Sequence, residues 1–181
     1  MILMFKEELL SDFVGTVIDI ETIGEFDRTY RQDSRQYRNI QQVIFGYITN
    51  DRIHIYCAKG KDGIDQLAKR IVRGLDTINR PFYAFNCDFE SGVWFHHLGI
   101  QIRFDGELNV SRLESKRDAI HSLGIPNYND PFKDKGLLCI KAWENRRYKF
   151  AIAHNRACLL KERDILINRG YRTPNELQFV T

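Results

Sequence analysis

Two acidic residues, Asp19 and Glu21, stand at the end of a run of apolar and β-branched residues. The run Phe13–Ile20 predicts a buried strand, and residues two apart on a strand share one face. We therefore expect Asp19 and Glu21 on one face, with Ile18 and Ile20 pointing into the core. Two neighbouring carboxylates repel each other unless a cation lies between them, and such hard oxygen ligands suit Mg²⁺ or Mn²⁺. A strand edge with two solvated acids is the alternative interpretation.

A second acidic group follows another apolar run, Pro81–Phe85, which also predicts a strand. The segment Asn86–Glu90 comes directly after it, where a helix is expected to begin. Acids at that point lie at the carboxyl-terminal edge of a sheet, where active sites of α/β folds gather. Glu90 and Asp88 are both candidates for a metal ligand on this turn.

These two segments together resemble the DEDD superfamily of 3′–5′ exonucleases, which includes the proofreading domains of DNA polymerases. The first motif of that family, D-x-E at the end of the first strand, is matched by Asp19 and Glu21. Its second motif, a strand followed by N-x-x-F-D, is matched by Asn86, Phe89 and Glu90, with Glu in place of the usual Asp. The resemblance extends over most of the chain, roughly from residue 13 to residue 168.

The third motif of the family, H-x(4)-D or Y-x(3)-D on a C-terminal helix, is only half present. His154 matches its histidine, but Cys158 and Leu159 stand where the aspartate is expected. Glu162 lies one helical turn beyond Cys158 on the same face, and its longer side chain leans back toward the N-terminus. Glu162 is therefore the candidate fourth ligand. The alternatives are Asp164, Asp130, or a surface ion pair of Glu162 with Lys161 or Arg163.

The resemblance implies a metal-dependent 3′–5′ exonuclease that hydrolyses phosphodiester bonds of single-stranded DNA or RNA with two Mg²⁺ or Mn²⁺ ions. Asp19 would bridge the two ions, Glu21 and Glu162 would complete the site on the nucleophile side, and Glu90 would support the other. His154 would act as general base, a role that suits its near-neutral pKa. A structural or metal-ligating histidine is the alternative.

Substrate contacts are expected from two groups of residues. Asn86 and Phe89 belong to the second motif, and Arg156 and Lys161 lie in a basic stretch. Between residues 141 and 169 there are eight basic and three acidic residues, which suggests a polyanionic partner or else a solvated helix face. Further candidates are the aromatic residues Phe85, Trp94 and Trp143, which could stack on bases or fill the core, and the arginines Arg28, Arg31, Arg35 and Arg38.

The elements that position these residues predict an α/β fold with a mixed sheet flanked by helices. After the strand at 13–20, a polar surface excursion (24–39) precedes two strands, 42–49 and 52–57, joined by a hairpin at Asn50-Asp51. Helices are expected at 63–78, 88–98, 111–123, 135–145 and 154–168, the last stopped by Gly170. A three-strand meander followed by further strands and helices suits an RNase H-like fold.

Length and composition predict one soluble domain. The 181 residues fit a single unit, 1–181, large enough to bury its own core. No apolar run approaches the roughly 18 residues of a membrane span, and no secretory signal is expected. The four cysteines are widely spaced and form no metal-binding pair, so a cytoplasmic location with reduced thiols is expected.

Two other functions are compatible with the same residues. The missing aspartate of the third motif also fits a catalytically degenerate RNase H-like domain that binds nucleic acid or a protein partner. A structure-specific endonuclease of the same fold is the other alternative. No membrane partner is expected, and the oligomeric state is open.

Overall fold

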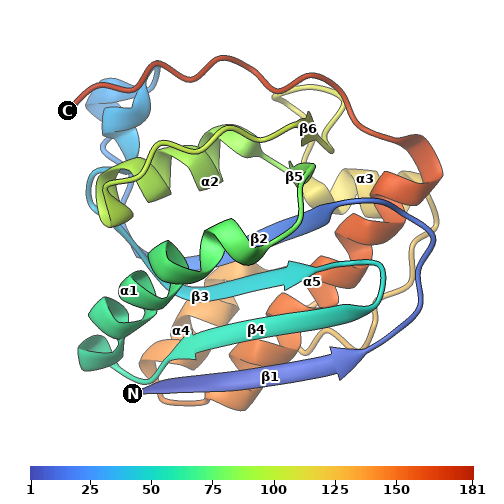
Figure 1. The fold of residues 1–181 in the computed structure, drawn as a ribbon, viewed down its shortest axis with the longest axis horizontal. Helices are drawn as coiled ribbons and strands as arrows, with labels where there is room; N and C mark the ends of the chain where they lie inside the picture. Colours follow the sequence, from blue (N-terminus) through green and yellow to red (C-terminus); the bar gives the residue numbers. More distant parts are fainter.

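Six strands form one mixed sheet in the order β1-β4-β3-β2-β5-β6, in a computed structural model that describes all residues from 1 to 181 (Figure 1). The strands β2, β3 and β4 make an antiparallel meander, and β5 and β6 run parallel to β2. The strand β1 adds to the outer edge of β4 in antiparallel register. The strands are β1 (Ile2–Glu8), β2 (Thr16–Gly24), β3 (Ile40–Ile48), β4 (Arg52–Ala58), β5 (Phe82–Ala84) and β6 (Gly106–Glu107).

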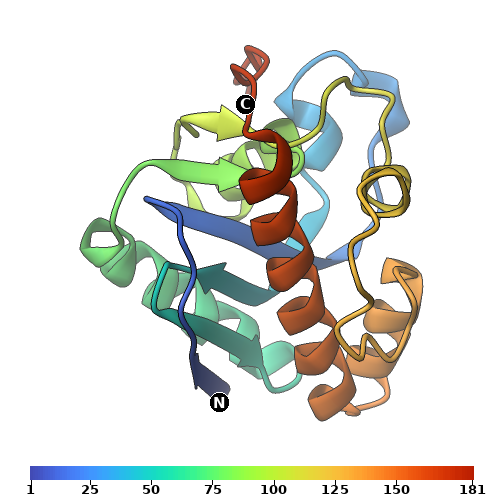
Figure 2. The same cartoon turned by 90° about the vertical axis from the view of Figure 1, so that its right-hand side faces the viewer.

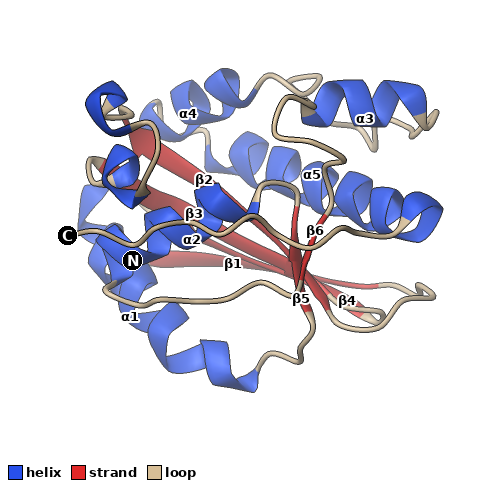
Figure 3. Ribbon diagram, turned by 90° about the horizontal axis from the view of Figure 1, so that it is seen from above, coloured by secondary structure: helices blue, strands red, loops and turns tan.

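Helices cover both faces of this sheet. The helices α4 and α5 pack on one face, and α1 packs on the opposite face against β3 and β4 (Figure 3). The long helix α5 crosses β2, β3 and β4, as Figure 2 shows most directly. The helices are α1 (Ile64–Gly74), α2 (Cys87–Val93), α3 (Lys116–Ser122), α4 (Gly136–Glu144) and α5 (Tyr148–Arg169).

This architecture confirms the predicted α/β class and is consistent with an RNase H-like fold. The meander, its hairpin at Asn50-Asp51 and the stop of α5 at Gly170 agree with the sequence-based expectation. Gly170 has a φ of 75°, which favours glycine, and its N–H bonds to the carbonyl of Leu166.

Several elements differ from the sequence-based expectation. The edge strand β1 and the two-residue strand β6 were not predicted, because β1 carries charged residues and β6 is too short to show alternation. The helix expected at 111–123 begins only at Lys116, because the side chain of Ser115 accepts the N–H of Asp118 and caps it. The last helix begins six residues earlier than expected, at Tyr148.

The polar excursion between β2 and β3 is more than a surface loop. It contains two short turns of 3₁₀-helix, at Arg28–Tyr30 and Ser34–Tyr37. The ring of Tyr37 is buried against Gly92, and it meets Phe89 edge-on at 5.9 Å between ring centroids. This segment therefore packs on α2 and helps to fix the helix that carries Glu90.

No helix of this chain combines the length and apolar character needed to cross a membrane. All four cysteines are buried and none forms a disulfide.

Candidate metal centre

Asp19 and Glu21 lie on the face of β2 that α5 covers. Asp19 is only 4% exposed, and its neighbours Ile18 and Ile20 are buried as well, on the other side of the strand. Both faces of β2 are therefore enclosed, so the two acids are not a solvated strand edge. After Glu21 the register against β3 shifts by one residue, and this bulge ends the regular pairing where the acids stand.

The close approach of α5 to the sheet depends on Gly46, which pairs with Asp19 across β2 and β3. A Cβ at Gly46 would lie 2.0 Å from Oδ1 of Asn155 and 2.9 Å from a methyl carbon of Leu159. The absence of a side chain thus lets Asn155 reach β2, where its Nδ2 donates to Oδ2 of Asp19 at 2.6 Å. Asn155 was not expected at the site, because an asparagine next to the motif histidine gives no signal in one sequence.

The second motif contributes Glu90 rather than Asp88. Glu90 is 5% exposed and lines the same pocket as Asp19 and Glu21. Burial raises the pKa of Glu90 well above its ordinary value, and the nearby carboxylates of Glu162 and Asp19 raise it further. Asp88 points elsewhere and pairs with Arg112 at 3.1 Å.

The candidate fourth acid is Glu162 rather than Asp164. Glu162 is 1% exposed on α5, and burial followed by the charge of Asp19 raises its pKa well above the ordinary value, against the opposing effect of Lys116. Asp164 is engaged away from the pocket by Arg163 and by the hydroxyl of Tyr128. Glu162 lies one helical turn beyond the family position, yet it is close enough to Asp19 for the ammonium of Lys116 to contact both carboxylates.

Lys116 is the cation that the sequence did not predict. Its ammonium lies 2.7 Å from Oδ1 of Asp19 and also contacts Oε1 of Glu162. Lys116 is the first residue of α3, which Ser115 caps, and its side chain reaches into the pocket from there. A serine followed three residues later by Asp118 indicates a helix start, but it does not reveal which way Lys116 points.

His154 is held by a residue from the preceding loop. Its Nδ1 lies 2.7 Å from Oδ1 of Asp130, and its Nε2 lies 3.7 Å from Oε1 of Glu21. Burial disfavours the charged ring, but the surrounding Cys158, Asp130 and Glu21 outweigh it and raise the pKa of His154 to about 11. Such a ring keeps its proton at neutral pH, and a protonated ring cannot accept another proton from water. The expected role of His154 as general base stays a prediction.

Asp130 is occupied as a supporting residue, so it does not serve as the fourth ligand. Its carboxylate accepts hydrogen bonds from the backbone N–H groups of Phe132 and Asp134, and it pairs with Lys161 at 2.9 Å. Burial raises the pKa of Asp130, but the hydrogen bond and charge of His154, together with the two backbone N–H groups, outweigh it and lower the pKa. Asp130 thus orients His154 toward Glu21.

Buried oxygen atoms without hydrogen-bond partners show that the pocket suits a cation. Oε2 of Glu90 and Oε2 of Glu162 have none, although buried carboxylate oxygens are ordinarily satisfied. Oxygen atoms of Asp19 and Glu21 and the sulfur of Cys158 lie within 4.8 Å of one another. Burial, then the charge of Asp19, raises the pKa of Glu21 to about 7 despite His154. Four acids thus face two cations, Lys116 and the protonated ring of His154, which leaves the cluster short of positive charge.

The expected substrate contacts divide into two groups. Asn86 and Phe89 line the acidic pocket, which has a volume of about 320 Å³. Lys161 is a correction, because its side chain is fully buried between Asp130 and Asp134 and cannot meet a substrate. Arg156 is also misplaced by the sequence-based expectation, because it forms a bidentate pair with Glu7 of β1, away from the pocket.

Half of the basic residues in the stretch between residues 141 and 169 are neutralised within the fold. Four of its eight basic residues form ion pairs with acids: Arg156 with Glu7, Lys161 with Asp130 and Asp134, Arg163 with Asp164, and Arg169 with Glu114. Two of the aromatic candidates, Trp94 and Trp143, are buried core residues and cannot stack on a base. Phe85 lines the pocket beneath Lys116.

A second cleft of about 420 Å³ adjoins the acidic pocket. The two share Phe85, Asn86 and Lys116, and the second cleft adds Arg31 and Arg112. Arg31 is one of the four arginines expected to contact a nucleic-acid strand, and it lines the cleft that adjoins the acidic pocket. Asp88 and Glu114 line the second cleft as well, and Arg112 pairs with Asp88, which leaves Arg31 as a cation without an acidic partner next to the acidic centre.

Comparisons with protein-family models, with curated proteins and with solved structures found no match for this chain.

Proposed function

We propose that this chain is a metal-dependent nuclease that hydrolyses phosphodiester bonds of single-stranded DNA or RNA, acting from the 3′ end. The observation that carries the proposal is a cluster of four acids from three separate elements: Asp19, Glu21 and Glu90 line one pocket, and Lys116 joins Glu162 to Asp19 beside it. Burying this many acids costs the fold stability, and their retention despite that cost points to a function. The 3′–5′ polarity rests on the resemblance of the motifs.

The donor set suits Mg²⁺ or Mn²⁺, because it consists of carboxylate oxygens. Asp19, Glu21, Glu90 and Glu162 would hold up to two ions, which when bound supply a hydroxide nucleophile and neutralise charge on the phosphate. Asn155 fixes the carboxylate of Asp19, and Asp130 orients the ring of His154 toward Glu21. Lys116 lies where a phosphate oxygen next to Asp19 could accept a hydrogen bond from its ammonium.

The adjoining cleft supports a strand as substrate. Arg31 lines it without an acidic partner, and guanidinium groups bind phosphates as bidentate donors. Arg112 lines it too, but pairs with Asp88. Phe89, which is half-buried and lines the acidic pocket, offers a ring for a terminal base to stack on. The proposal keeps the expected cytoplasmic location, where the four buried thiols stay reduced.

The test is release of nucleotides from single-stranded oligonucleotides labelled at either end, with Mn²⁺, Mg²⁺ or a chelator. Mononucleotides released from the 3′ end only when a divalent ion is present would support the proposal. Internal fragments and cleavage of circular strands would instead indicate an endonuclease. Complete lack of cleavage by protein that binds Mn²⁺ would overturn the proposed activity.

One observation favours a second candidate, a degenerate domain that binds nucleic acid or a protein without cutting. The ammonium of Lys116 lies between Asp19 and Glu162, in the position where a metal ion would otherwise neutralise them. In that case the ammonium of Lys116 would permanently occupy the position of a metal ion. Failure of Mn²⁺ to raise the melting temperature of the protein would favour this candidate.

A further inference from the structure

The face of the sheet opposite the acidic pocket carries a row of aromatic rings that α1 only partly covers. Phe45 and Tyr47 flank Gly46 on β3, and strand alternation points them away from α5. Each pairs across to β4, Phe45 with Tyr56 and Tyr47 with His54. The ring planes of the second pair are nearly parallel, with centroids 4.9 Å apart and an interplanar angle of 8°. We call these four rings the aromatic face.

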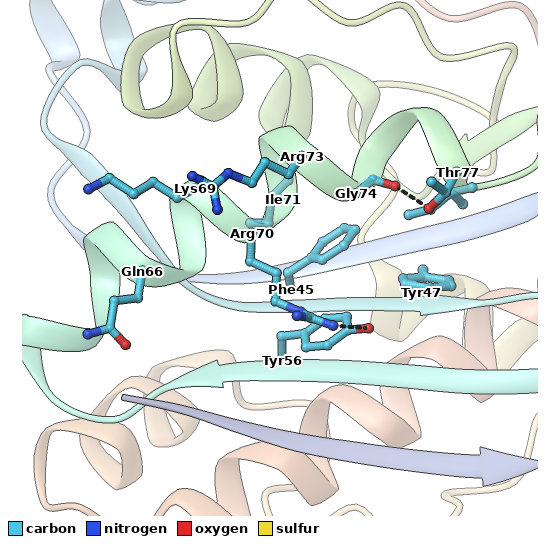
Figure 4. A pocket seen from close by; sticks show the side chains of 11 residues that line it. Phe45, Tyr47, Tyr56, Gln66, Lys69, Arg70, Ile71, Arg73, Gly74 and Thr77 are labelled. Atoms are coloured by element: carbon cyan, nitrogen blue, oxygen red, sulfur yellow. Dashed lines mark hydrogen bonds between the residues drawn. The ribbon is translucent and has the colours of Figure 1, made fainter.

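A cavity of about 490 Å³ lies between the aromatic face and α1 (Figure 4). It is within the usual size range of ligand sites, about 300–1,000 Å³. A second cavity, of about 610 Å³, continues from it and shares Tyr47, Thr77 and Ile78. Together they form a groove that runs from α1 along the sheet toward the hairpin of β3 and β4.

Cations without acidic partners border this groove. Lys69, Arg70 and Arg73 recur at helical spacing on the exposed side of α1 and line the first cavity. None of the three takes part in an ion pair, unlike the arginines of α5. The guanidinium of Arg70 lies over the ring of Tyr56 at 4.3 Å, which joins the cationic border to the aromatic face.

The edge strand β1 extends this surface. Its register places Met4 beside Tyr56 and Lys6 beside His54, so both point to the same side as the aromatic face. Both side chains are exposed, and Lys6 adds another cation without an ion pair. At the far end of the groove Arg52 and Arg80 are also cationic, although each is paired with an aspartate.

We propose that this groove binds a single-stranded nucleic acid, with bases stacked on Tyr47 and His54, the half-buried rings of the aromatic face, and phosphates bound by Lys69, Arg70 and Arg73. Flat rings interleaved with cations match a ligand that alternates bases with phosphates. A duplex keeps its bases stacked inside and cannot use the rings, and an acidic peptide has no bases. Binding here is independent of the proposed cleavage, because the groove and the acids lie on opposite faces of the sheet.

Anisotropy of a fluorescein-labelled single-stranded DNA of about 12 nucleotides, titrated with the protein in chelator at low salt, measures this binding without any cleavage. We expect the variant Lys69→Glu/Arg73→Glu to bind at least about tenfold more weakly and to show a smaller dependence on salt. The matched control, Lys141→Glu/Lys149→Glu, makes the same charge change at exposed positions on α4 and α5 and should change affinity much less.

The ring of Tyr47 provides a second test that does not alter charge. Tyr47→Leu should weaken binding by about tenfold, whereas Tyr47→Phe should bind as the unaltered protein does. Equal weakening by the two charge-reversed variants, or no effect of Tyr47→Leu in protein that melts normally, would overturn the proposal. Displacement of the strand by an equal charge concentration of polyglutamate, or equally tight binding of a duplex, would overturn it as well.

Discussion

The two faces of the central sheet differ in charge and in how their charges are satisfied. On the α5 side, buried acids crowd around one ammonium from Lys116. On the α1 side, the exposed cations of α1 border aromatic rings and have no acidic partners. The β-strand β3 contributes to both faces, because Gly46 faces the acids while Phe45 and Tyr47 face the groove. The period of two along a strand thus separates two surfaces of opposite charge by the thickness of one sheet.

The difference also shows where the fold bears an energetic cost. Exposed cations such as Lys69 and Arg73 are solvated and affect stability little. The acids on the other face are buried, and the raised pKa values of Glu90 and Glu162 mean that each resists ionisation. Retaining such a cluster is typical of a functional centre rather than of a structural core.

The largest expected effect is that of Asp19→Asn, which should abolish the activity of the acidic face and leave the binding of the aromatic face unchanged. We expect metal-dependent cleavage to fall at least about a thousandfold, because the charge of Asp19 acts on Glu21, Glu90 and Glu162 alike, while the fold and the strand affinity in chelator persist. Nucleotide release with Mn²⁺ and circular dichroism measure the two effects. Asp62→Asn, an exposed acid near the start of α1, is the control. Wild-type cleavage by the Asp19→Asn variant would contradict the assignment of the metal centre.

The shared strand is tested by Gly46→Ala. The added methyl group would collide with Asn155 and Leu159, so we expect a loss of about 2–4 kcal/mol in the free energy of unfolding. Urea denaturation measures this loss. Gly74→Ala is the matched control, because nothing lies within 4 Å of its Cβ position, and it should be neutral or slightly stabilising. A stable Gly46→Ala protein would mean that α5 does not need this close approach.

The role of the ammonium is tested by Lys116→Met. Without it, Asp19 and Glu162 lose their cation, and we expect the metal-free protein to lose about 2 kcal/mol of stability at neutral pH, less than for a fully buried pair because Lys116 is partly exposed. Mn²⁺ should then raise the melting temperature of the variant more than that of the unaltered protein. If Mn²⁺ stabilises neither protein, the pocket is not a cation site and the degenerate alternative is favoured.

Much of the fold could be predicted from the sequence because its signals are local. The β-branched runs of β2, β3 and β4 and the apolar stripe of α1 each show a clear period. The strand β1 was missed because its alternation of Met4 and Lys6 with partly buried residues gives a mixed signal. The short strand β6 depends on its neighbours for pairing, and no local pattern reveals that.

The candidate site was predictable only in part. Asp19, Glu21 and Glu90 follow strands directly, so their positions could be inferred from order and spacing. The choice of Glu162 over Asp164 depends on which side of α5 meets the sheet. The entry of Lys116, and the enclosure of Lys161 by two aspartates, depend on loops that fold across the helix. Contacts of this kind join residues far apart in the chain and leave no periodic signal.

The smallest expected effect is a pH dependence that belongs to the acidic face alone. The folded protein raises the pKa of Glu21 from 4.5 to about 7, so it binds that proton more tightly than the unfolded chain does. Stability is therefore full below about pH 4.5 for this group and declines as the pH rises to about 7. The raised pKa of His154, from 6.5 to about 11, has the same sign, with its decline beginning above about pH 6.5.

We accordingly expect the metal-free protein to be less stable at pH 8 than at pH 5 by about 2 kcal/mol, measured by urea denaturation. Glu21→Gln should remove the part of this slope below about pH 7, because the amide does not titrate, and leave the part above about pH 6.5 that belongs to His154. Strand binding through the aromatic face should change little above pH 6.5, since lysine and arginine stay charged and burial lowers the pKa of His54, which keeps that ring neutral there. An unchanged slope between pH 5 and 6.5 in Glu21→Gln would assign the pH dependence to other groups and would weaken the contrast between the two faces.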